Sequence, residues 1–270
     1  MTFIRNSWYP ASWSDALGDK PLARTFLEEE VVLYRTEDGT ATALSNMCPH
    51  RFAALAKGRL HGDSIACPYH GLRFGPDGRC THNPHGPAAA SIRVKSYPLA
   101  ERFGMIWIWM GEPSAADPAA IRVLAAREDE RFDWVTGYLH VEGNYQLIID
   151  NLLDLSHVEF LHPFLSDPTD TYPTEVICFE DGAEVVSRYN RQKSNRTQLV
   201  AALWDDAPDT ISLMSEMRWT APSNLVQRNG FDVPGLAEEE DHPLQFPLCH
   251  LLTPETRFTS HYFWAGGRNM

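Results

Sequence analysis

Long apolar runs are missing from this 270-residue sequence. No run approaches the roughly 20 residues of a membrane-spanning helix, and the first residues lack the apolar core of a signal peptide, so we expect a cytoplasmic protein without a membrane partner. Basic residues are outnumbered by acidic ones, 23 against 36, and the net charge of −13 argues against nucleic acid as a partner. The five cysteines have no framework spacing, which argues against a disulfide-stapled fold.

Four potential metal ligands form two tight pairs, Cys48-Pro-His50 and Cys67-Pro-Tyr-His70. Two thiolates and two imidazoles suit either a tetrahedral zinc ion or a Rieske [2Fe–2S] cluster, in which the cysteines hold one iron and the histidines the other. Zinc sites of this composition usually separate cysteines from histidines, whereas each pair here contains one of each, and this alternation favours the iron–sulfur cluster. The other cysteines are expected to be small buried residues: Cys80, Cys178 and Cys249.

The segment around these pairs differs in charge from the rest of the chain. Between Arg51 and Arg102 eight Lys or Arg residues face three acidic residues, so this segment carries +5 and the remainder −18. One interpretation is an ordinary solvated surface. The other is a basic docking face for an acidic redox partner, because complementary charge steers protein encounters.

Residues 8–110 predict a small all-β unit. Strands over 31–34 and 40–44 flank a turn in which Gly39 supplies the required backbone conformation, and this hairpin runs directly into the first cysteine. We therefore expect the ligand loops at hairpin tips. Residues 111–120, rich in Gly, Pro and Ala, predict a linker.

Residues 144–162 are predicted to form a helix. Leu and Ile occur on every side of its helical wheel, which predicts a buried helix. Asn151, Asp154 and His157 are spaced three residues apart and fall on one polar stripe of it. Buried polar groups need partners, so the stripe is either a hydrogen-bonded structural network or part of a metal site.

His157 and His162 lie five residues apart, about 140° around a regular helix, so they cannot both face one metal without a local distortion. Pro163 ends the helix, and a widened π-type last turn would bring the two rings together. Two histidines with one carboxylate on one face of Fe(II) would leave positions open for oxygen and substrate.

The last hundred residues alternate apolar and polar side chains between turn signals, which predicts an antiparallel sheet and a surface loop at the acidic run 238–241. The expected strands are 185–189, 198–202, 211–219, 248–252 and 258–264.

Together the two ligand motifs resemble those of the Rieske non-haem iron oxygenases, in particular the terminal oxygenase components of the vanillate and dicamba O-demethylase group. Other matching segments are residues 6–9, 82–86, 150–157 and 252–256. The resemblance implies an α+β fold, with an N-terminal all-β Rieske domain over residues 1–115. A helix-grip type catalytic domain with an antiparallel sheet would follow over residues 116–270.

The resemblance also implies residue roles. Asp154 would bridge a cluster histidine of one subunit to an iron-ligand histidine of its neighbour, which implies a ring-shaped homotrimer, and Asn151 would lie near the iron. Asn224 and His250 match positions that contact an aromatic acid. The implied metal ligands are Cys48, His50, Cys67 and His70 for the cluster and His157 and His162 for a mononuclear iron.

The activity implied is that of a multicomponent monooxygenase. A separate NADH-dependent flavin/iron–sulfur reductase would supply electrons, and the oxygenase would use O2 to remove the methyl group of a methoxylated aromatic acid as formaldehyde. Ring or side-chain hydroxylation or dihydroxylation by the same machinery stays open. A non-catalytic Rieske electron carrier is a third possibility, but it would need only about 100 residues.

The third ligand of the mononuclear iron has no obvious candidate. In the family this carboxylate comes from a helix near the C-terminus, later than this sequence extends. Asp150 lies about two helical turns before His157, too far to share its metal, and Asp154 is assigned to the bridge. We therefore expect a catalytic domain that lacks its last helix, at most two protein ligands to the iron, and an exposed apolar strip.

Overall fold

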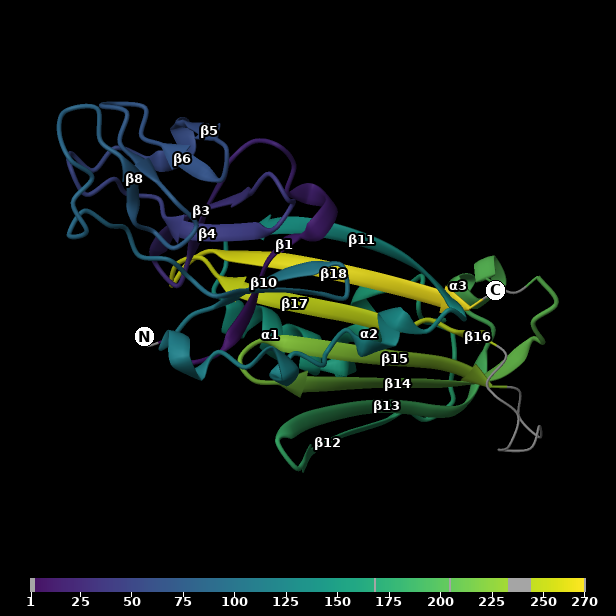
Figure 1. Cartoon of the computed structure of the whole chain (residues 1–270). Coiled ribbons are helices and arrows are strands. Elements are labelled where there is room, and N and C mark those ends of the chain that lie inside the picture. The colour runs from purple at the N-terminus through teal and green to yellow at the C-terminus, as the bar shows by residue number, and fades with distance from the viewer. Residues whose placement is uncertain (1–2, 168, 204, 233–243, 270) are drawn as a thin grey trace. The chain divides into compact units, whose positions relative to one another are not determined.

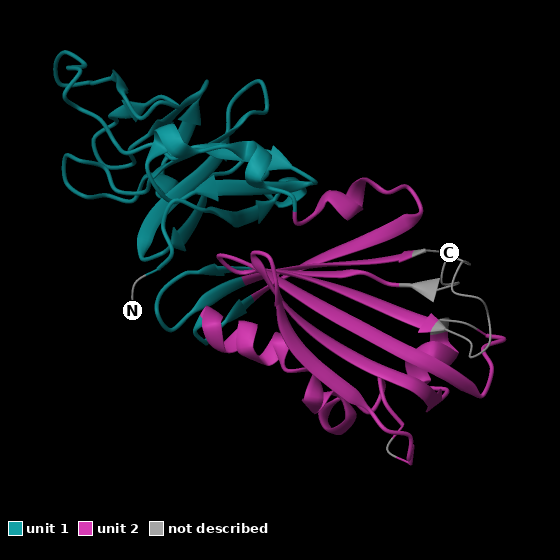
Figure 2. Ribbon diagram, turned by 90° about the horizontal axis from the view of Figure 1, so that it is seen from below, with its two compact units in different colours: residues 1–122, 140–144, 252–261 teal, residues 123–139, 145–251, 262–270 magenta. Residues whose placement is uncertain are grey.

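The computed structural model describes residues 3–167, 169–203, 205–232 and 244–269 (Figure 1). Its residue contacts define two compact units, coloured separately in Figure 2. Unit 1 comprises Met1–Arg122, His140–Asn144 and Leu252–His261, and unit 2 comprises Val123–Leu139, Tyr145–Leu251 and Tyr262–Met270. Unit 1 is therefore assembled from three segments, whereas the sequence predicted one boundary after residue 115. The predicted acidic loop 238–241 lies outside the described residues.

The N-terminal part of unit 1 contains three small antiparallel sheets, with strand orders β1-β10-β9, β2-β3-β4 and β5-β6-β7-β8. Large apolar side chains such as Tyr34, Phe74 and Trp107 are fully buried between them. The strands are β1 Trp8–Trp13, β2 Leu22–Phe26, β3 Glu29–Arg35, β4 Ala41–Ser45, β5 Arg59–His61, β6 Ser64–Ala66, β7 Arg73–Phe74, β8 Cys80–His82, β9 Leu99–Arg102 and β10 Met105–Trp109.

The predicted hairpin before Cys48 is confirmed: β3 pairs with β4, and Gly39 adopts a φ of +86° in the turn between them. The predicted linker at 111–120 is bonded to unit 1 rather than free. Trp8 Nε1 donates to the carbonyl of Asp117 (2.9 Å), and the Arg102 guanidinium donates to the carbonyl of Pro118 (2.8 Å). Two short 3-10 turns, Pro113–Ala115 and Pro118–Ala120, shape this segment.

The large sheet has the order β11-β18-β17-β15-β14-β13-β12, with β16 paired to β15. The predicted α+β class, an all-β first part followed by an antiparallel sheet with few helices, is confirmed. The strands are β11 Phe132–Val141, β12 Glu175–Asp181, β13 Glu184–Asn195, β14 Thr210–Thr220, β15 Asn224–Asp232, β16 Leu244–Gln245, β17 Leu248–Pro254 and β18 Ser260–Asn269. The helices are α1 Tyr145–Leu153, α2 Val158–Leu161 and α3 Gln198–Leu203. None of the helices among the described residues is long and apolar enough to cross a membrane.

Two local predictions are wrong. Residues 198–202 form α3 instead of a strand, because Thr197 Oγ1 accepts a hydrogen bond from the N–H of Val200 (3.3 Å) and starts a helix of good helix formers. Cys178 is exposed instead of buried, because it lies on the edge strand β12, most of which faces solvent. Cys80 and Cys249 are buried as predicted.

A glycine next to the second ligand loop gives a test of this packing. A Cβ at Gly58 would lie 1.8 Å from the carbonyl oxygen of Ala66, so Gly58→Ala should force the backbones apart and lower the free energy of unfolding by about 1–3 kcal/mol. Gly18→Ala is the matched control, because no heavy atom lies within 4 Å of its Cβ position. Thermal melting of both variants compares them, and equal stability would contradict the described contact.

Candidate metal centres

The loops that carry Cys48 and Cys67 close with the same backbone hydrogen bonds. The N–H of Cys48 donates to the carbonyl of Ala53 (3.0 Å), and the N–H of Cys67 donates to that of Leu72 (2.7 Å). In each loop the N–H four residues later donates back to the cysteine carbonyl (2.9 and 3.1 Å). The prediction that the loops lie at hairpin tips agrees with this closure, since β6 and β7 flank the second loop.

Each loop turns at a residue with positive φ, Phe52 at +57° and Gly71 at +73°. This left-handed conformation lets the chain reverse direction just after the metal-binding residues. The two loops therefore present their ligands from equivalent turns. They differ in that the histidine follows its cysteine by two residues in the first loop and by three in the second.

The ligand set brought together here suits a [2Fe–2S] cluster. Cys48 and Cys67 are buried, and the rings of His50 and His70 lie 4.6 Å apart between centroids. Burial raises the pKa of the Cys48 thiol to about 11, with a further contribution from the adjacent Cys67 thiol. Nδ1 of His70 is buried and has no hydrogen-bond partner among the described residues. Both features are expected where a metal normally supplies the missing partner and stabilises the thiolates.

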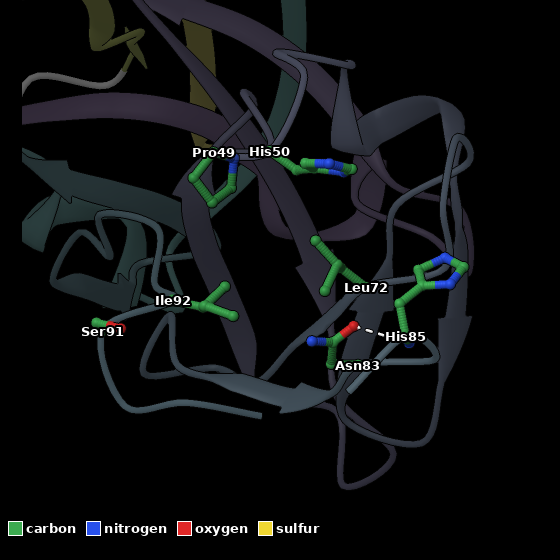
Figure 3. A pocket seen from close by; sticks show the side chains of 7 residues that line it. All are labelled: Pro49, His50, Leu72, Asn83, His85, Ser91 and Ile92. Carbon is green, nitrogen blue, oxygen red and sulfur yellow. Dashed lines mark hydrogen bonds between the residues drawn. The ribbon is translucent and has the colours of Figure 1, made fainter. Parts of the chain in front are cut away.

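A pocket of about 350 Å³ opens beside His50 (Figure 3). Leu72 and Ile92 line it with apolar surface, and Asn83 and His85 add polar groups. Oδ1 of Asn83 accepts a hydrogen bond from the backbone N–H of His85 (3.0 Å), which fixes this corner of the pocket.

The segment of the second ligand pair is not the continuous buried helix that the sequence predicted. Helix α1 ends at Leu153, and Asp154 caps a short 3-10 turn, Leu155–His157, by accepting hydrogen bonds from the N–H (3.0 Å) and Oγ (2.5 Å) of Ser156. The preference of aspartate for capping positions explains the break. The predicted single polar stripe is therefore divided between two helical segments.

His157 and His162 lie close together without the predicted π-type turn, because α2 between them ends at Leu161 and His162 leaves the helical conformation (φ −122°, ψ 71°). Their ring centroids lie 5.2 Å apart, and Nδ1 of His157 is buried with no hydrogen-bond partner among the described residues. Such a pair can supply two imidazole ligands to one metal ion. Within the described residues, no three His, Cys, Asp or Glu side chains are placed to hold one metal ion; a Rieske cluster needs only two protein ligands at each of its irons.

Asn151 and Asp154 are exposed, as is much of the apolar surface beside them. Phe160 is 82% and Leu161 68% exposed on α2, which also contradicts the predicted burial. Burial was predicted because apolar side chains occur all round the helical wheel, but only Tyr145, Ile149 and Leu155 of this segment are buried.

Arg191 on β13 fixes the segment that carries the two histidines. Its side chain is only 3% exposed; it contacts Asp170 (3.1 Å) on the loop after α2 and Glu159 (2.5 Å) on α2 itself. Its Nε also donates to Thr174 Oγ1 (2.8 Å), which in turn bonds to the Glu159 carboxylate. The pKa of Asp170 is lowered by hydrogen bonds and by Arg191, although burial acts in the opposite direction.

His250 belongs to a chain of hydrogen bonds across four strands of the sheet. Gln227 Nε2 donates to Ser215 Oγ (2.8 Å), so Gln227 Oε1 faces Nε2 of His250 (3.4 Å). Nδ1 of His250 lies 2.6 Å from the hydroxyl of Tyr262. Burial lowers the pKa of His250 to about 4, so the ring is neutral near pH 7. Tyr262 then donates to Nδ1, and Nε2–H is the donor that the histidine offers.

Asn224 lies on the opposite face of the sheet from His250. In the β15–β17 pairing Leu225 faces His250 and Asn224 faces Leu251, and consecutive residues of a strand point to opposite sides. Oδ1 of Asn224 is buried without a hydrogen-bond partner among the described residues. Sequence reasoning overlooked Gln227, which shares the face of His250; strand alternation could have identified it only with the strand pairing known.

Two buried cysteines with two neighbouring histidines in the first part, and a histidine pair beside a large antiparallel sheet, are the ligand sets of a two-centre iron oxygenase. Comparison with known proteins agrees. Residues 7–98 match the model of the Rieske [2Fe-2S] domain, and residues 141–270 match that of the vanillate O-demethylase oxygenase C-terminal domain. The chain belongs to the Rieske non-haem iron oxygenases, as an oxygenase component.

Three relatives illustrate the likeness. The oxygenase component of dicamba O-demethylase from Stenotrophomonas maltophilia is 40% identical over 100% of this chain and 79% of the relative. A toluene-4-sulfonate monooxygenase system iron-sulfur subunit of Comamonas testosteroni is 35% identical over 99% of this chain and 79% of the relative. A vanillate O-demethylase oxygenase subunit of a Pseudomonas species is 31% identical over 99% of this chain and 77% of the relative.

Solved structures agree with these relatives. Dicamba monooxygenase bound to 3,6-dichlorosalicylic acid superimposes with a TM-score of 0.93 at 36% identity, over 100% of this chain and 79% of that one. A second structure of that enzyme, with non-heme iron and dicamba, gives a TM-score of 0.86 at 36% identity, over 100% and 78%. The predicted cofactors, a Rieske cluster and a mononuclear iron, are confirmed by these findings. The assignment of individual ligands and of the third iron ligand stays a prediction.

The buried position of Arg191 predicts a large effect on stability. Arg191→Met would leave the carboxylate of Asp170 buried without its cation, so we expect the free energy of unfolding to fall by about 3–5 kcal/mol. Arg131→Met removes an exposed ion pair with Asp129 (2.8 Å) and should change it by at most about 1 kcal/mol. Denaturant titration of both variants tests this, and equal losses would show that Arg191 is not a buried anchor.

Proposed function

We propose that this protein is the oxygenase component of a multicomponent monooxygenase that removes the methyl group of a methoxylated aromatic acid and releases formaldehyde. The observation that carries this proposal is the 40% sequence identity, over the whole of this chain, with the oxygenase component of dicamba O-demethylase. The cluster and the iron, when bound, supply electron transfer and oxygen activation respectively. The protein's own residues bind the substrate, orient it and exclude water.

His250 is the residue proposed to recognise the acid group. It is buried and neutral, and Tyr262 fixes its tautomer so that Nε2–H can donate to a carboxylate oxygen. Its contact with Gln227 is long, 3.4 Å, so a substrate oxygen can replace that weak bond without breaking a strong one. The Gln227 amide then lies beside the same substrate oxygen. The role suggested for Asn224 stays a prediction.

A homotrimer is proposed because Asp154 is exposed and lies next to a large apolar surface. Asp154 accepts only from Ser156 among the described residues, so its second oxygen is available to a histidine of another subunit. Phe160 and Leu161, both strongly exposed, would be covered by such a contact. Asp154 would then orient a cluster histidine and an iron-ligand histidine from opposite sides.

Electrons are proposed to reach the cluster from a separate NADH-dependent reductase carrying flavin and an iron–sulfur centre. Relatives that are named as the oxygenase component or the iron-sulfur subunit of a larger system support an external source of reducing equivalents. This proposal also makes aromatic acids the small-molecule partners, together with O2.

The experiment that tests the activity compares methoxybenzoates with methoxybenzene. The iron-loaded protein, supplied with NADH, an electron-transfer reductase and O2, should release one formaldehyde per demethylated product. We expect kcat/KM for the best methoxybenzoate to exceed that for methoxybenzene at least tenfold, because only the acid has a carboxylate that can accept a strong hydrogen bond from His250. If the protein consumed oxygen but released no formaldehyde from any methoxybenzoate tested, demethylation would be refuted.

Side-chain hydroxylation is the second candidate, and the 35% identical toluene-4-sulfonate relative favours it. Methylbenzoates and toluene sulfonates in the same assay would then give hydroxymethyl products without formaldehyde. Product analysis by mass spectrometry separates the two activities.

The bridging role predicts the behaviour of Asp154→Asn. Asparagine caps a helix as well as aspartate, so the turn before His157 should persist. We expect both metal centres to fill and the cluster to be reducible, while turnover falls by about 10–100-fold or more. Asp150→Asn removes another exposed carboxylate, from α1, and should leave turnover unchanged. If Asp154→Asn turned over at nearly the wild-type rate, the bridging role of Asp154 would be contradicted.

A further inference from the structure

His261 is a buried titratable residue to which the proposed function gives no role. Its side chain is 2% exposed, and it lies on strand β18 directly before Tyr262. Consecutive residues of a strand point to opposite faces of a sheet, so the ring of His261 lies on the face opposite to that of Tyr262. A buried polar side chain costs free energy unless it has hydrogen-bond partners. The partners of His261 therefore indicate what the residue does.

Both ring nitrogens of His261 are held by strand β2. Nε2–H donates to the carbonyl of Thr25 (2.9 Å), and the guanidinium of Arg24 donates to Nδ1 in a longer bond (3.5 Å). Phe26 adds an edge-to-face contact, with ring centroids 5.7 Å apart. Three consecutive residues of β2 thus hold one histidine ring in one tautomer and one orientation.

The charges around His261 keep its ring neutral. Burial lowers the pKa of His261 to about 4, and the nearby Arg24 acts in the same direction. Glu255, on the turn after β17, acts in the opposite direction, and the His140 ring on β11 lies 6.0 Å away between centroids. A neutral imidazole has one acceptor and one donor nitrogen, which match the guanidinium of Arg24 and the carbonyl of Thr25.

The backbone next to His261 is anchored at a second place. The turn between β2 and β3 places Leu27 and Glu28 at φ values of +53° and +67°, a conformation that residues other than glycine rarely adopt. Their N–H groups donate to the carbonyls of Pro254 (2.8 Å) and Glu255 (2.9 Å), at the turn between β17 and β18. The strained turn therefore serves to hold the β17–β18 hairpin in place. All of these residues belong to unit 1.

The anchored hairpin carries the two residues on which acid recognition depends. His250 lies on β17 and Tyr262 on β18, and the Tyr262 hydroxyl lies 2.6 Å from Nδ1 of His250. This bond determines which nitrogen of His250 carries the proton. A shift of β18 by about 1 Å would lengthen the bond beyond the range of an O–H hydrogen bond, roughly 2.5–3.0 Å.

We propose that His261 is a positioning residue that sets the preference of the site for aromatic acids over neutral aromatic ethers. Strand β2 holds its ring, and the ring holds β18 so that the Tyr262 hydroxyl stays on Nδ1 of His250. His261 thus acts through Tyr262 and not on the substrate. This inference rests on the proposed function, because it requires His250 to bind an aromatic carboxylate.

The test is a double-mutant cycle in the metal-loaded full chain. Phenylalanine keeps a ring at position 261 but removes both nitrogens, so His261→Phe should weaken binding of 4-methoxybenzoate about tenfold, as Tyr262→Phe should. The double variant should bind this acid within twofold of Tyr262→Phe, because the hydroxyl that His261 positions is then absent. The affinity for methoxybenzene, which has no carboxylate, should change less than twofold. Titration calorimetry without a reductase measures each affinity.

His261→Gln is the rescue variant. Its side-chain amide can accept from Arg24 and donate to the carbonyl of Thr25, so the affinity for 4-methoxybenzoate should lie within threefold of the wild-type value. His140→Gln is the matched control, because it replaces an exposed histidine that lies beside the same ring but bonds to Glu255 (2.5 Å) instead of β2. Its affinity for the acid should equal that of the wild type.

Arg24→Gln repeats the cycle with His261 itself intact. It removes only the longer of the two hydrogen bonds to the ring, so the variant should fold even where His261→Phe does not. We expect a loss of acid affinity of about threefold, which disappears in the Tyr262→Phe background.

Wild-type acid affinity in His261→Phe overturns the proposal. A loss that adds in full to that of Tyr262→Phe also overturns it, because His261 would then act on the fold in general. A wild-type protein that binds methoxybenzene as tightly as 4-methoxybenzoate contradicts acid recognition by His250, and this proposal with it. Binding requires no turnover, so the positioning role and formaldehyde release can each fail while the other persists.

Discussion

A buried guanidinium links the sheet to the segment that carries His157 and His162. Arg191 contacts carboxylates before and after the turn at Pro163, so α2 and the following loop are held by one side chain of β13. Helix α2 has only four residues and turns its large apolar side chains outward, so it cannot be held by packing alone. Without this ionic anchor, little would fix the spacing of His157 and His162.

Candidate metal ligands could be proposed from the sequence because they are close together in it. Each cluster pair lies within four residues, and His157 and His162 lie within six, so short-range spacing contains their chemistry. The break at Asp154 was missed because aspartate also fitted the helical stripe, and apolar residues on every side suggested burial. The local pattern of apolar residues predicts that a segment is helical more reliably than it predicts whether the helix is buried.

The residues proposed to recognise the substrate needed long-range information. Gln227 and His250 meet only because β15 and β17 pair in one register, and that register cannot be read from either strand alone. A shift by one residue would have placed Asn224 on the side of His250, as the sequence comparison suggested. The strand prediction at 198–202 failed for a local reason instead, because Thr197 caps a helix there.

The paired ligand loops have a consequence for how the protein survives the loss of iron. Each loop is closed by its own backbone hydrogen bonds, and all five cysteines are free, so no disulfide joins one loop to the other. A bound cluster would therefore be the covalent cross-link between the two loops. A disulfide that closes a loop of similar length adds on the order of 3 kcal/mol to the free energy of unfolding. Oxidative damage to the cluster would therefore loosen the two hairpins as well as end electron transfer, exposing buried thiols to further oxidation.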